Sequence, residues 1–175
     1  MIIGLTGAGG AGKDTVADHL VKHYGFIKLS WATPLKRGLA AMGFPEPADR
    51  ADKEKVIEGF DFSWRQAAQA LGTEWGRALD PKIWIKLVGQ IMEEQPRVHW
   101  VISDCRFENE ALVVRRLGGQ VWHLRGRQAD LGVAAGHVSE SGLVHGERDE
   151  VIHNIGTVEQ LYLQVDHLMR ESEAE

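Results

Sequence analysis

Short apolar runs alternate along the chain with segments of helical periodicity. Five apolar runs predict β-strands, within residues 2–6, 26–30, 99–103, 120–124 and 150–156. The run at 99–103 has the continuous apolar character typical of strands inside a parallel sheet, with Trp100, Val101 and Ile102 in succession. Strands that alternate with helices predict an α/β fold in which helices cover both faces of the sheet.

Capping and turn residues mark the ends of the predicted helices. The first predicted helix begins at Lys13 and stops at Gly25, and the second begins at Pro34. The third begins at a capping box formed by Ser63 and Gln66, and the fourth begins at Asp80 and Pro81 and ends at about Glu94. The fifth covers about 107–117, and the last begins at Thr157, capped with Gln160, and ends at about Glu171. Two stretches have neither pattern. The polar, proline-bearing segment 43–61 is expected to be a mobile insert or a surface excursion. The segment 125–148, rich in Gly, Arg and His, is expected to be a long functional loop.

Composition and charge narrow the class of protein. The chain has 175 residues, of which 43% are hydrophobic and 26% charged, so we expect a single domain over 1–175. The formal net charge of −5 argues against general binding to polymeric nucleic acid. Cys105 is the only cysteine, so no intrachain disulfide can form, which suits a reducing cytoplasm.

Targeting signals are not evident in the sequence. The apolar start at 1–7 is too short for a signal peptide, and no window approaches the roughly 20 apolar residues of a membrane span. We therefore expect a cytoplasmic protein without a membrane partner. The sequence leaves open whether the chain forms a homodimer.

A glycine-rich stretch with a phosphate-binding pattern joins the first strand to the first helix. It fits Gly-x-x-x-x-Gly-Lys with the residues Gly7, Ala8, Gly9, Gly10, Ala11, Gly12 and Lys13. Such glycines let backbone N–H groups surround phosphate oxygens, and Lys13 would reach the β- and γ-phosphates of ATP. The alternative is a turn that binds nothing, but four glycines in six positions cost too much backbone entropy for that role alone.

Asp14 occupies the position where such loops usually carry a Ser or Thr ligand for Mg²⁺. Its carboxylate either holds the metal through water or faces solvent in the first helical turn, where negative charge is favourable. Thr15 still offers a hydroxyl next to the phosphates. We therefore predict ATP with Mg²⁺ held by no direct protein ligand, through water near Asp14, Thr15 and Asp104.

Polar residues after the strand at 99–103 are further candidates. Asp104 lies at the carboxyl end of that strand, where open α/β sheets bind ligands, although it is also a candidate cap for the next helix. Arg106 can make a bidentate contact with a phosphate. Glu108 and Glu110 either border the site or pair with Arg106 on a helix surface.

Basic and aromatic residues elsewhere fit an acceptor site and a lid. Arg65 and Arg77 are candidates to hold the acceptor's phosphate, while Trp75 and Trp64 either stack on its base or belong to the core. Arg125 and Arg127 begin the predicted lid at 125–148 and would bring positive charge to the transferred group. The histidines in and around this loop match no zinc spacing, namely His123, His137, His145 and His153.

Several stretches together resemble the phage-type deoxynucleoside monophosphate kinases. They are "SWATPLKRGL" (30–39), "ALGTEWGR" (70–77), "ISDCRFENEA" (102–111), "GGQVWHLRGR" (118–127), "HVSE" (137–140) and "HNIGT" (153–157). The resemblance implies a P-loop kinase fold, a three-layer sandwich with a five-stranded, mainly parallel sheet, a substrate-binding region at about 34–95 and a lid. It also implies transfer of the γ-phosphoryl group of ATP to a deoxynucleoside monophosphate, for DNA precursor synthesis.

The same resemblance adds site residues and leaves some questions open. Lys36 and Ser139 lie in matching stretches and join Glu108 among the expected acceptor-binding residues, and the turn at Asn154 and Gly156 is expected near adenine. Thr33 replaces an expected acidic residue, so the acceptor preference is open, as are the base and the sugar. A phage origin would place the protein in the host cytoplasm.

Two other functions remain as alternatives. One is a P-loop kinase for another phosphorylated metabolite, of the dephospho-coenzyme A or phosphomevalonate type. The other is a P-loop ATPase or nucleotide sensor that transfers nothing to a small molecule.

Overall fold

The computed structural model describes residues 1–49, 51–126 and 143–174. Its contacts divide the chain into two compact units, Met1–Ser30 with Gln95–Glu175, and Trp31–Glu94. The predicted acceptor-binding region at about 34–95 overlaps the second unit, and its role stays a prediction. No helix in the described ranges is both long and apolar enough to cross a membrane.

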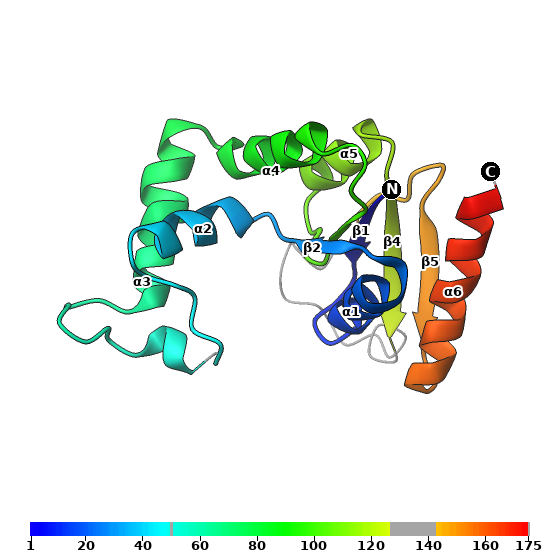
Figure 1. Cartoon of the computed structure of the whole chain (residues 1–175), viewed down its shortest axis with the longest axis horizontal. Coiled ribbons are helices and arrows are strands. Elements are labelled where there is room, and N and C mark those ends of the chain that lie inside the picture. Colours follow the sequence, from blue (N-terminus) through cyan, green and yellow to red (C-terminus); the bar gives the residue numbers. More distant parts are fainter. Residues whose placement is uncertain (50, 127–142, 175) are drawn as a thin grey trace. The chain divides into compact units, whose positions relative to one another are not determined.

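The first unit contains a five-stranded parallel sheet (Figure 1). Its strands are β1 (Ile2–Thr6), β2 (Ile27–Leu29), β3 (Trp100–Ile102), β4 (Gln120–Gly126) and β5 (Glu150–Asn154). Their order is β2-β3-β1-β4-β5, and every neighbouring pair is parallel. The α/β prediction is confirmed, with β4 two residues longer than the apolar run, so that 125 and 126 belong to the strand and not to the loop.

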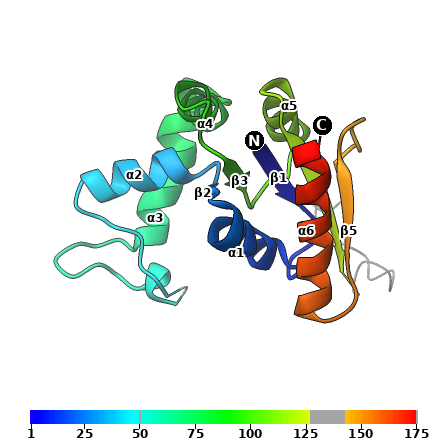
Figure 2. The ribbon, with the colours of Figure 1, turned by 45° about the vertical axis from the view of Figure 1, so that its right-hand side comes forward.

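Three helices of this unit cover the two faces of the sheet. They are α1 (Lys13–Tyr24), α5 (Glu108–Arg116) and α6 (Val158–Ala174). Helices α1 and α6 pack together on one face, and α5 contacts β1 and β4 on the other (Figure 2). Alternation along each strand explains this, because Ile3 and Leu5 point into the α1–α6 core while Gly4 lies against Val114 of α5. Trp122 is fully buried and belongs to the same core.

Local signals in the sequence set the helix ends. Gly25 adopts φ 69° and closes α1, as expected for a left-handed C-cap. At the start of α6, Gln160 N donates to Thr157 Oγ1 (3.3 Å) and Thr157 N donates to Gln160 Oε1 (3.0 Å). This capping box confirms the predicted start, and α6 continues to Ala174.

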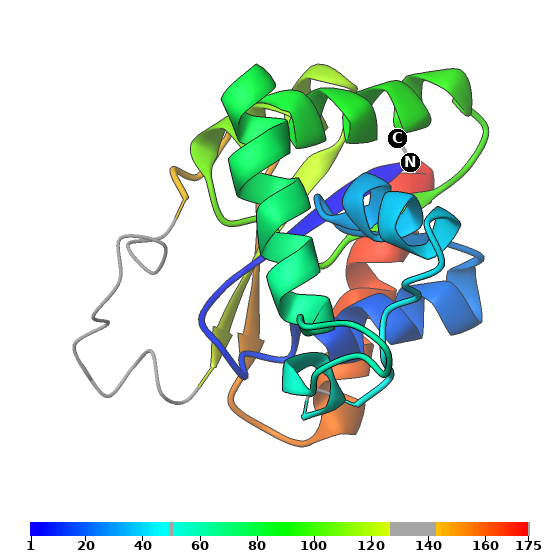
Figure 3. The same cartoon turned by 90° about the vertical axis from the view of Figure 1, so that its left-hand side faces the viewer.

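The second unit is helical. It comprises α2 (Thr33–Ala41), the 3₁₀ turn η1 (Asp52–Glu54), α3 (Trp64–Gln69), the π-helical segment η2 (Ala70–Arg77) and α4 (Ile83–Glu94). Helix α3 runs directly into η2 as one rod (Figure 3). The predicted capping box is present, since Ser63 N donates to Gln66 Oε1 (2.8 Å) and Gln66 N to Ser63 Oγ (3.3 Å).

The core of this unit decides between the two interpretations of Trp64. Its side chain is buried with Leu35 and Leu39, and its Nε1 donates to Phe44 O (3.1 Å). Trp64 is therefore a core residue and not a platform for a base. Trp84 has a similar structural role, because its Nε1 donates to Gly72 O (2.8 Å).

The segment 43–61 is more ordered internally than its polar sequence predicts. Phe44 makes edge-to-face contacts with Phe60 (5.1 Å between ring centroids) and Phe62 (5.5 Å). Phe60 and Phe62 are also in contact, with centroids 5.2 Å apart. These three rings, the Phe44–Phe60–Phe62 cluster, hold the excursion together by aromatic packing.

Candidate active site

The glycine-rich loop lies at the carboxyl end of β1 and leads into α1. Gly7, Gly10 and Gly12 have φ values of 140°, 76° and 99°, in a region that other residues rarely adopt. Gly12 is also the residue that precedes the first turn of α1. The sequence pattern thus gives a loop between a strand and the N-terminus of a helix, the arrangement with which backbone N–H groups bind anions in other proteins.

Lys13 begins α1 and closes over the loop. Its Nζ donates to Gly7 O (2.7 Å) and Ala8 O (2.8 Å). Partial burial, together with the positive charge of Arg106, lowers the pKa of Lys13, while Asp14 and Asp104 oppose the shift. The structure therefore brings Lys13, Asp104 and Arg106 close enough to interact electrostatically, as the adjacency of β1 and β3 requires.

Asn154, at the end of β5, supports the same loop. Its Nδ2 donates to Ala11 O (3.0 Å), which ties the loop to the sheet. The expected contact of Asn154 with adenine stays a prediction. Gly156 lies in the next turn, where an added Cβ would overlap the side chain of Gln160.

Gly12 offers a test of this support. A Cβ at Gly12 would lie 2.6 Å from Asn154 Nδ2, and φ is 99° there. We expect Gly12→Ala to lower the free energy of unfolding by about 1–3 kcal/mol, because of strain and the clash. Urea denaturation measures this. Gly9→Ala is the control, since a Cβ there meets nothing within 4 Å and its φ is not positive. Equal stability losses in both variants would contradict the prediction.

Asp14 points to solvent in this structure. Its side chain is 81% exposed, and Oδ1 accepts a hydrogen bond from Lys28 Nζ (2.8 Å). Lys28 also pairs with Asp18 one turn later (3.1 Å). Of the two roles considered for Asp14, this arrangement favours the solvent-facing carboxylate in the first turn.

The connection from β3 to α5 is capped by Glu110 and not by Asp104. Glu110 is buried, and its Oε2 accepts from Arg106 N (2.8 Å) and Phe107 N (3.0 Å). Burial raises the pKa of Glu110 although these bonds oppose the shift. The capping role considered for Asp104 is wrong, because Phe107 is the N-cap of α5.

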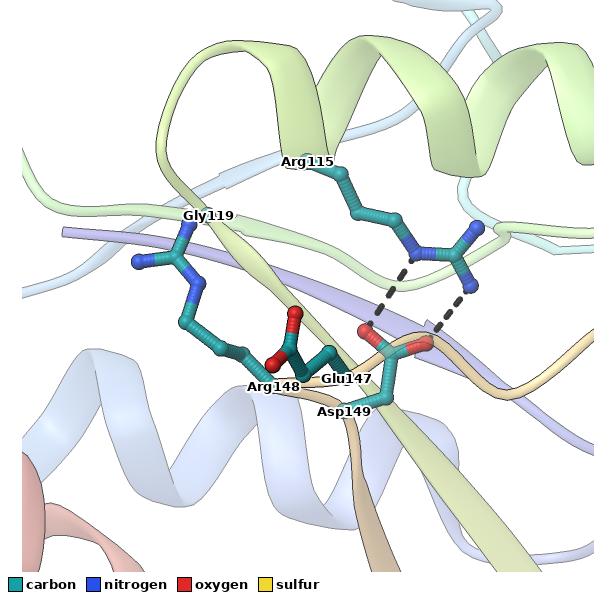
Figure 4. Close-up of a pocket in the computed structure, with 5 residues that line it drawn as sticks. All are labelled: Arg115, Gly119, Glu147, Arg148 and Asp149. Atoms are coloured by element: carbon teal, nitrogen blue, oxygen red, sulfur yellow. Dashed lines mark hydrogen bonds and ion pairs between the residues drawn. The ribbon is translucent and has the colours of Figure 1, made fainter.

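Glu108 belongs to a separate ionic network around Asp149. Its Oε1 pairs with Arg115 Nη1 (2.7 Å), so the pairing with Arg106 considered for this glutamate is wrong. Arg115 also makes a two-pronged contact with Asp149, through Nη2 to Oδ2 (2.6 Å) and Nε to Oδ1 (3.4 Å) (Figure 4). Asp149 further accepts from Val121 N (3.0 Å) and Gly146 N (2.7 Å). Sequence reasoning missed this network.

The Asp149 network is electrostatically strong. Burial alone would raise the pKa of Asp149, but hydrogen bonds from Arg115 and from two backbone N–H groups hold it well below its usual range. His123 Nε2 also contacts Asp149 (3.3 Å), its ring stacks on His145 (5.0 Å between centroids), and burial lowers its pKa. The described residues contain no group of three side chains that could hold a metal ion.

A pocket of about 390 Å³ adjoins this network, lined by Arg115, Gly119, Glu147, Arg148 and Asp149 (Figure 4). Gly119 precedes β4 and Asp149 precedes β5, so the pocket lies at the amino ends of these strands. The phosphate loop follows β1 at the opposite end of the parallel sheet. This pocket is therefore distinct from the phosphate loop.

The predicted acceptor-binding residues of the second unit have different surroundings. Trp75 in η2 is 54% exposed, as a base-stacking residue would have to be. Arg77 is also exposed. Arg65 pairs with Glu54, and Lys36 pairs with Glu46 (3.0 Å). Their roles stay predictions.

Part of the predicted lid at 125–148 lies within the described residues. Arg125 is exposed near the end of β4. Arg127, Ser139 and His137 lie outside the described residues.

Comparisons with known proteins agree with this geometry. The family model for deoxynucleotide monophosphate kinase matches residues 49–165. A protein of Acanthamoeba polyphaga mimivirus, provisionally named deoxynucleotide monophosphate kinase, is 29% identical over 94% of both chains. The deoxynucleotide monophosphate kinase of Escherichia phage RB69 is 28% identical over 66% of this chain and 49% of its own.

Solved structures show the fold alone. TT1252 from Thermus thermophilus aligns with a TM-score of 0.55 at 21% identity, covering 98% of this chain and 97% of that one. A sugar kinase from Janibacter sp. HTCC2649 aligns with a TM-score of 0.53 at 15% identity, covering 97% and 94%. The glycine-rich loop, the parallel sheet and the match to the family model over most of the chain lead to one conclusion: the chain belongs to the deoxynucleotide monophosphate kinase family.

Proposed function

We propose that this protein transfers the γ-phosphoryl group of ATP to a deoxynucleoside monophosphate and releases the diphosphate used for DNA synthesis. The observation that carries the proposal is the grouping of Lys13, Arg106 and Asp104 at the phosphate loop of a chain in this family. Phosphoryl transfer depends on positioning and charge neutralisation, and this grouping supplies cations for both.

Each residue of the grouping has a distinct role in the proposal. Backbone N–H groups of 7–13 bind the phosphates of ATP, and Lys13 exchanges its bonds to Gly7 O and Ala8 O for phosphate oxygens. Arg106 orients the phosphate that accepts the transferred group. The proton of an acceptor phosphate is already largely dissociated at neutral pH, so no strong general base is needed.

The donor set also fits Mg²⁺. Oxygen ligands are what this ion prefers, and Asp104 and Thr15 would hold it through water. When bound, it neutralises charge on the phosphates. Asp14, paired with Lys28, is the less suitable ligand.

The acceptor is proposed to use the second unit. Arg65, Arg77 and Lys36 supply positive charge there, and the exposed Trp75 supplies an aromatic face. Arg125, with Arg127 in the predicted lid, would add charge near the transferred group and help exclude water.

An acceptor panel tests the function. ADP formation is measured with ATP·Mg²⁺ and each of the four deoxynucleoside monophosphates, the ribonucleoside monophosphates, dephospho-coenzyme A and phosphomevalonate. We expect turnover that depends on a deoxynucleoside monophosphate. Turnover only with dephospho-coenzyme A or only with phosphomevalonate would instead indicate a kinase for that metabolite. Hydrolysis of ATP that no acceptor stimulates would indicate an ATPase.

Asp14 gives a narrower prediction. We expect Asp14→Ser to retain Mg²⁺-dependent turnover and to change the free energy of unfolding by less than about 1 kcal/mol, because an exposed ion pair contributes little. Initial rates across a Mg²⁺ titration and urea denaturation measure the two quantities. Complete loss of Mg²⁺-dependent turnover in a folded variant would show that the carboxylate itself holds the metal.

A further inference from the structure

A pocket of about 640 Å³ lies entirely within the second unit, along α3 and η2. Its lining residues are Phe62, Gln66, Ala67, Gln69, Ala70 and Glu74. Residues 66, 70 and 74 are four apart and share one side of the continuous helix. Ala67 and Ala70 have short side chains, so the pocket floor leaves room for a flat ligand.

The walls of this pocket are fixed by interactions outside it. The Phe44–Phe60–Phe62 cluster holds the ring of Phe62 from two sides. Gln66 Oε1 is occupied by Ser63 N (2.8 Å), which fixes the side-chain amide and leaves its Nε2 as a donor. The pocket is thus built on packed and capped elements, as a preformed site requires.

Two polar side chains in the lining are available to a ligand. Among the described residues, neither Gln69 nor Glu74 has a hydrogen-bond or ion-pair partner. A carboxylate accepts two parallel N–H bonds, whereas an amide both donates and accepts. Guanine is the DNA base with two adjacent N–H donors, N1–H and N2–H₂, on one edge, and its O6 accepts from an amide donor.

We infer that this pocket holds the base of the acceptor nucleotide and that Glu74 and Gln69 select guanine. This inference rests on the proposed function and adds a base preference to it. Glu74 accepts from N1–H and N2–H₂, and Gln69 or Gln66 donates to O6. In this inference Phe62, and not Trp75, packs against the ring, because Trp75 does not line the pocket. Arg65 and Arg77 lie on the same continuous helix but do not line this pocket. Their proposed role remains the binding of the acceptor's phosphate.

Steady-state kinetics with the four deoxynucleoside monophosphates tests the inference at saturating ATP·Mg²⁺. We expect the wild-type kcat/KM to be highest for dGMP. Glu74→Gln should lower the kcat/KM for dGMP by about 5–150-fold, the range for loss of one bidentate base contact, chiefly through KM. The value for dTMP should change much less. Glu94→Gln is the matched control, since Glu94 is an exposed glutamate of α4 outside the pocket lining.

Filling the pocket gives a second variant. Ala70→Phe places a ring where the base would lie, so calorimetric binding of dGMP should be lost while ATP still binds. Thermal denaturation establishes that both variants fold. Three results would overturn the inference while leaving the kinase function intact. Glu74→Gln could affect all four acceptors equally, or it could affect none of them. The third result is dGMP binding that Ala70→Phe leaves unchanged.

The two proposals can fail separately. If no deoxynucleoside monophosphate supports ADP formation, the proposed function is lost. Calorimetric titration of wild type and Glu74→Gln with dGMP still tests whether the pocket binds the base. Tight binding to wild type that Glu74→Gln removes supports the base site. No binding of dGMP to wild type overturns it.

Discussion

Replacing Lys13 by alanine is expected to lower kcat by about 10²–10³-fold, the effect of removing one donor that stabilises charge in a transition state. Lys13 is held over the loop by Gly7 O (2.7 Å) and Ala8 O (2.8 Å), next to Arg106 and Asp104. Lys13 is the only lysine in residues 7–16, so no other lysine of the loop or of the first turn of α1 can replace its charge. The KM for the acceptor should change less than kcat, because the contact strengthens as charge develops on the phosphate.

The fold should survive this substitution. The two bonds of Lys13 are solvent-exposed and contribute about 1 kcal/mol each or less to stability. Lys22→Ala is the matched control, since Lys22 is an exposed lysine in the last turn of the same helix. Initial-rate kinetics and urea denaturation of both variants check the expectation. A Lys13→Ala variant with wild-type kcat would mean that the loop is not the catalytic phosphate site.

Local signals made most of the first unit predictable. Gly25 ends α1 because its left-handed conformation is unfavourable for other residues, and Thr157 with Gln160 starts α6 because their side chains satisfy free backbone N–H groups. Both of these signals depend only on residues close together in the sequence. Parallel strands bring their carboxyl ends to one edge of the sheet, and the pairing of β1 with β3 therefore places the loop after β1 near Asp104.

Two kinds of feature were not predictable from the sequence: contacts between residues far apart in the chain, and the different surroundings of residues of the same type. The π-helical geometry of η2 depends on tertiary packing, with Gly72 and Gly76 against Leu35 and Trp84, and no local pattern specifies it. Trp64 and Trp75 look alike in the sequence, yet one is core and the other is exposed. Arg115 and Asp149 are 34 residues apart, and an aspartate before a short strand is only a weak signal for a buried ion pair.

That buried pair leads to the largest expected effect on stability. Asp149→Ala should lower the free energy of unfolding by about 3–5 kcal/mol, because it leaves the N–H groups of Val121 and Gly146 without their acceptor. It also removes the buried anion that faces Arg115, whose guanidinium then keeps only Glu108 and Val144 O as partners. The Asp149 side chain is only 1% exposed, so water cannot take its place fully. Urea denaturation measures the loss. Glu108→Ala is the matched control, since Glu108 binds the same arginine but is 43% exposed, and it should lower stability by about 1 kcal/mol or less.

The pH dependence of stability separates the charge of Asp149 from its packing. Because the folded pKa of Asp149 is held below the unfolded value, its ionised form stabilises the protein above roughly pH 4, and that contribution is lost as the pH falls further. Asp149→Asn keeps the shape and one acceptor but does not titrate. The difference in unfolding free energy between wild type and Asp149→Asn should therefore be constant from pH 7 to about pH 5 and should shrink below pH 4. A difference that stays constant down to pH 3 would show that Asp149 stabilises this end of the sheet by shape and not by charge.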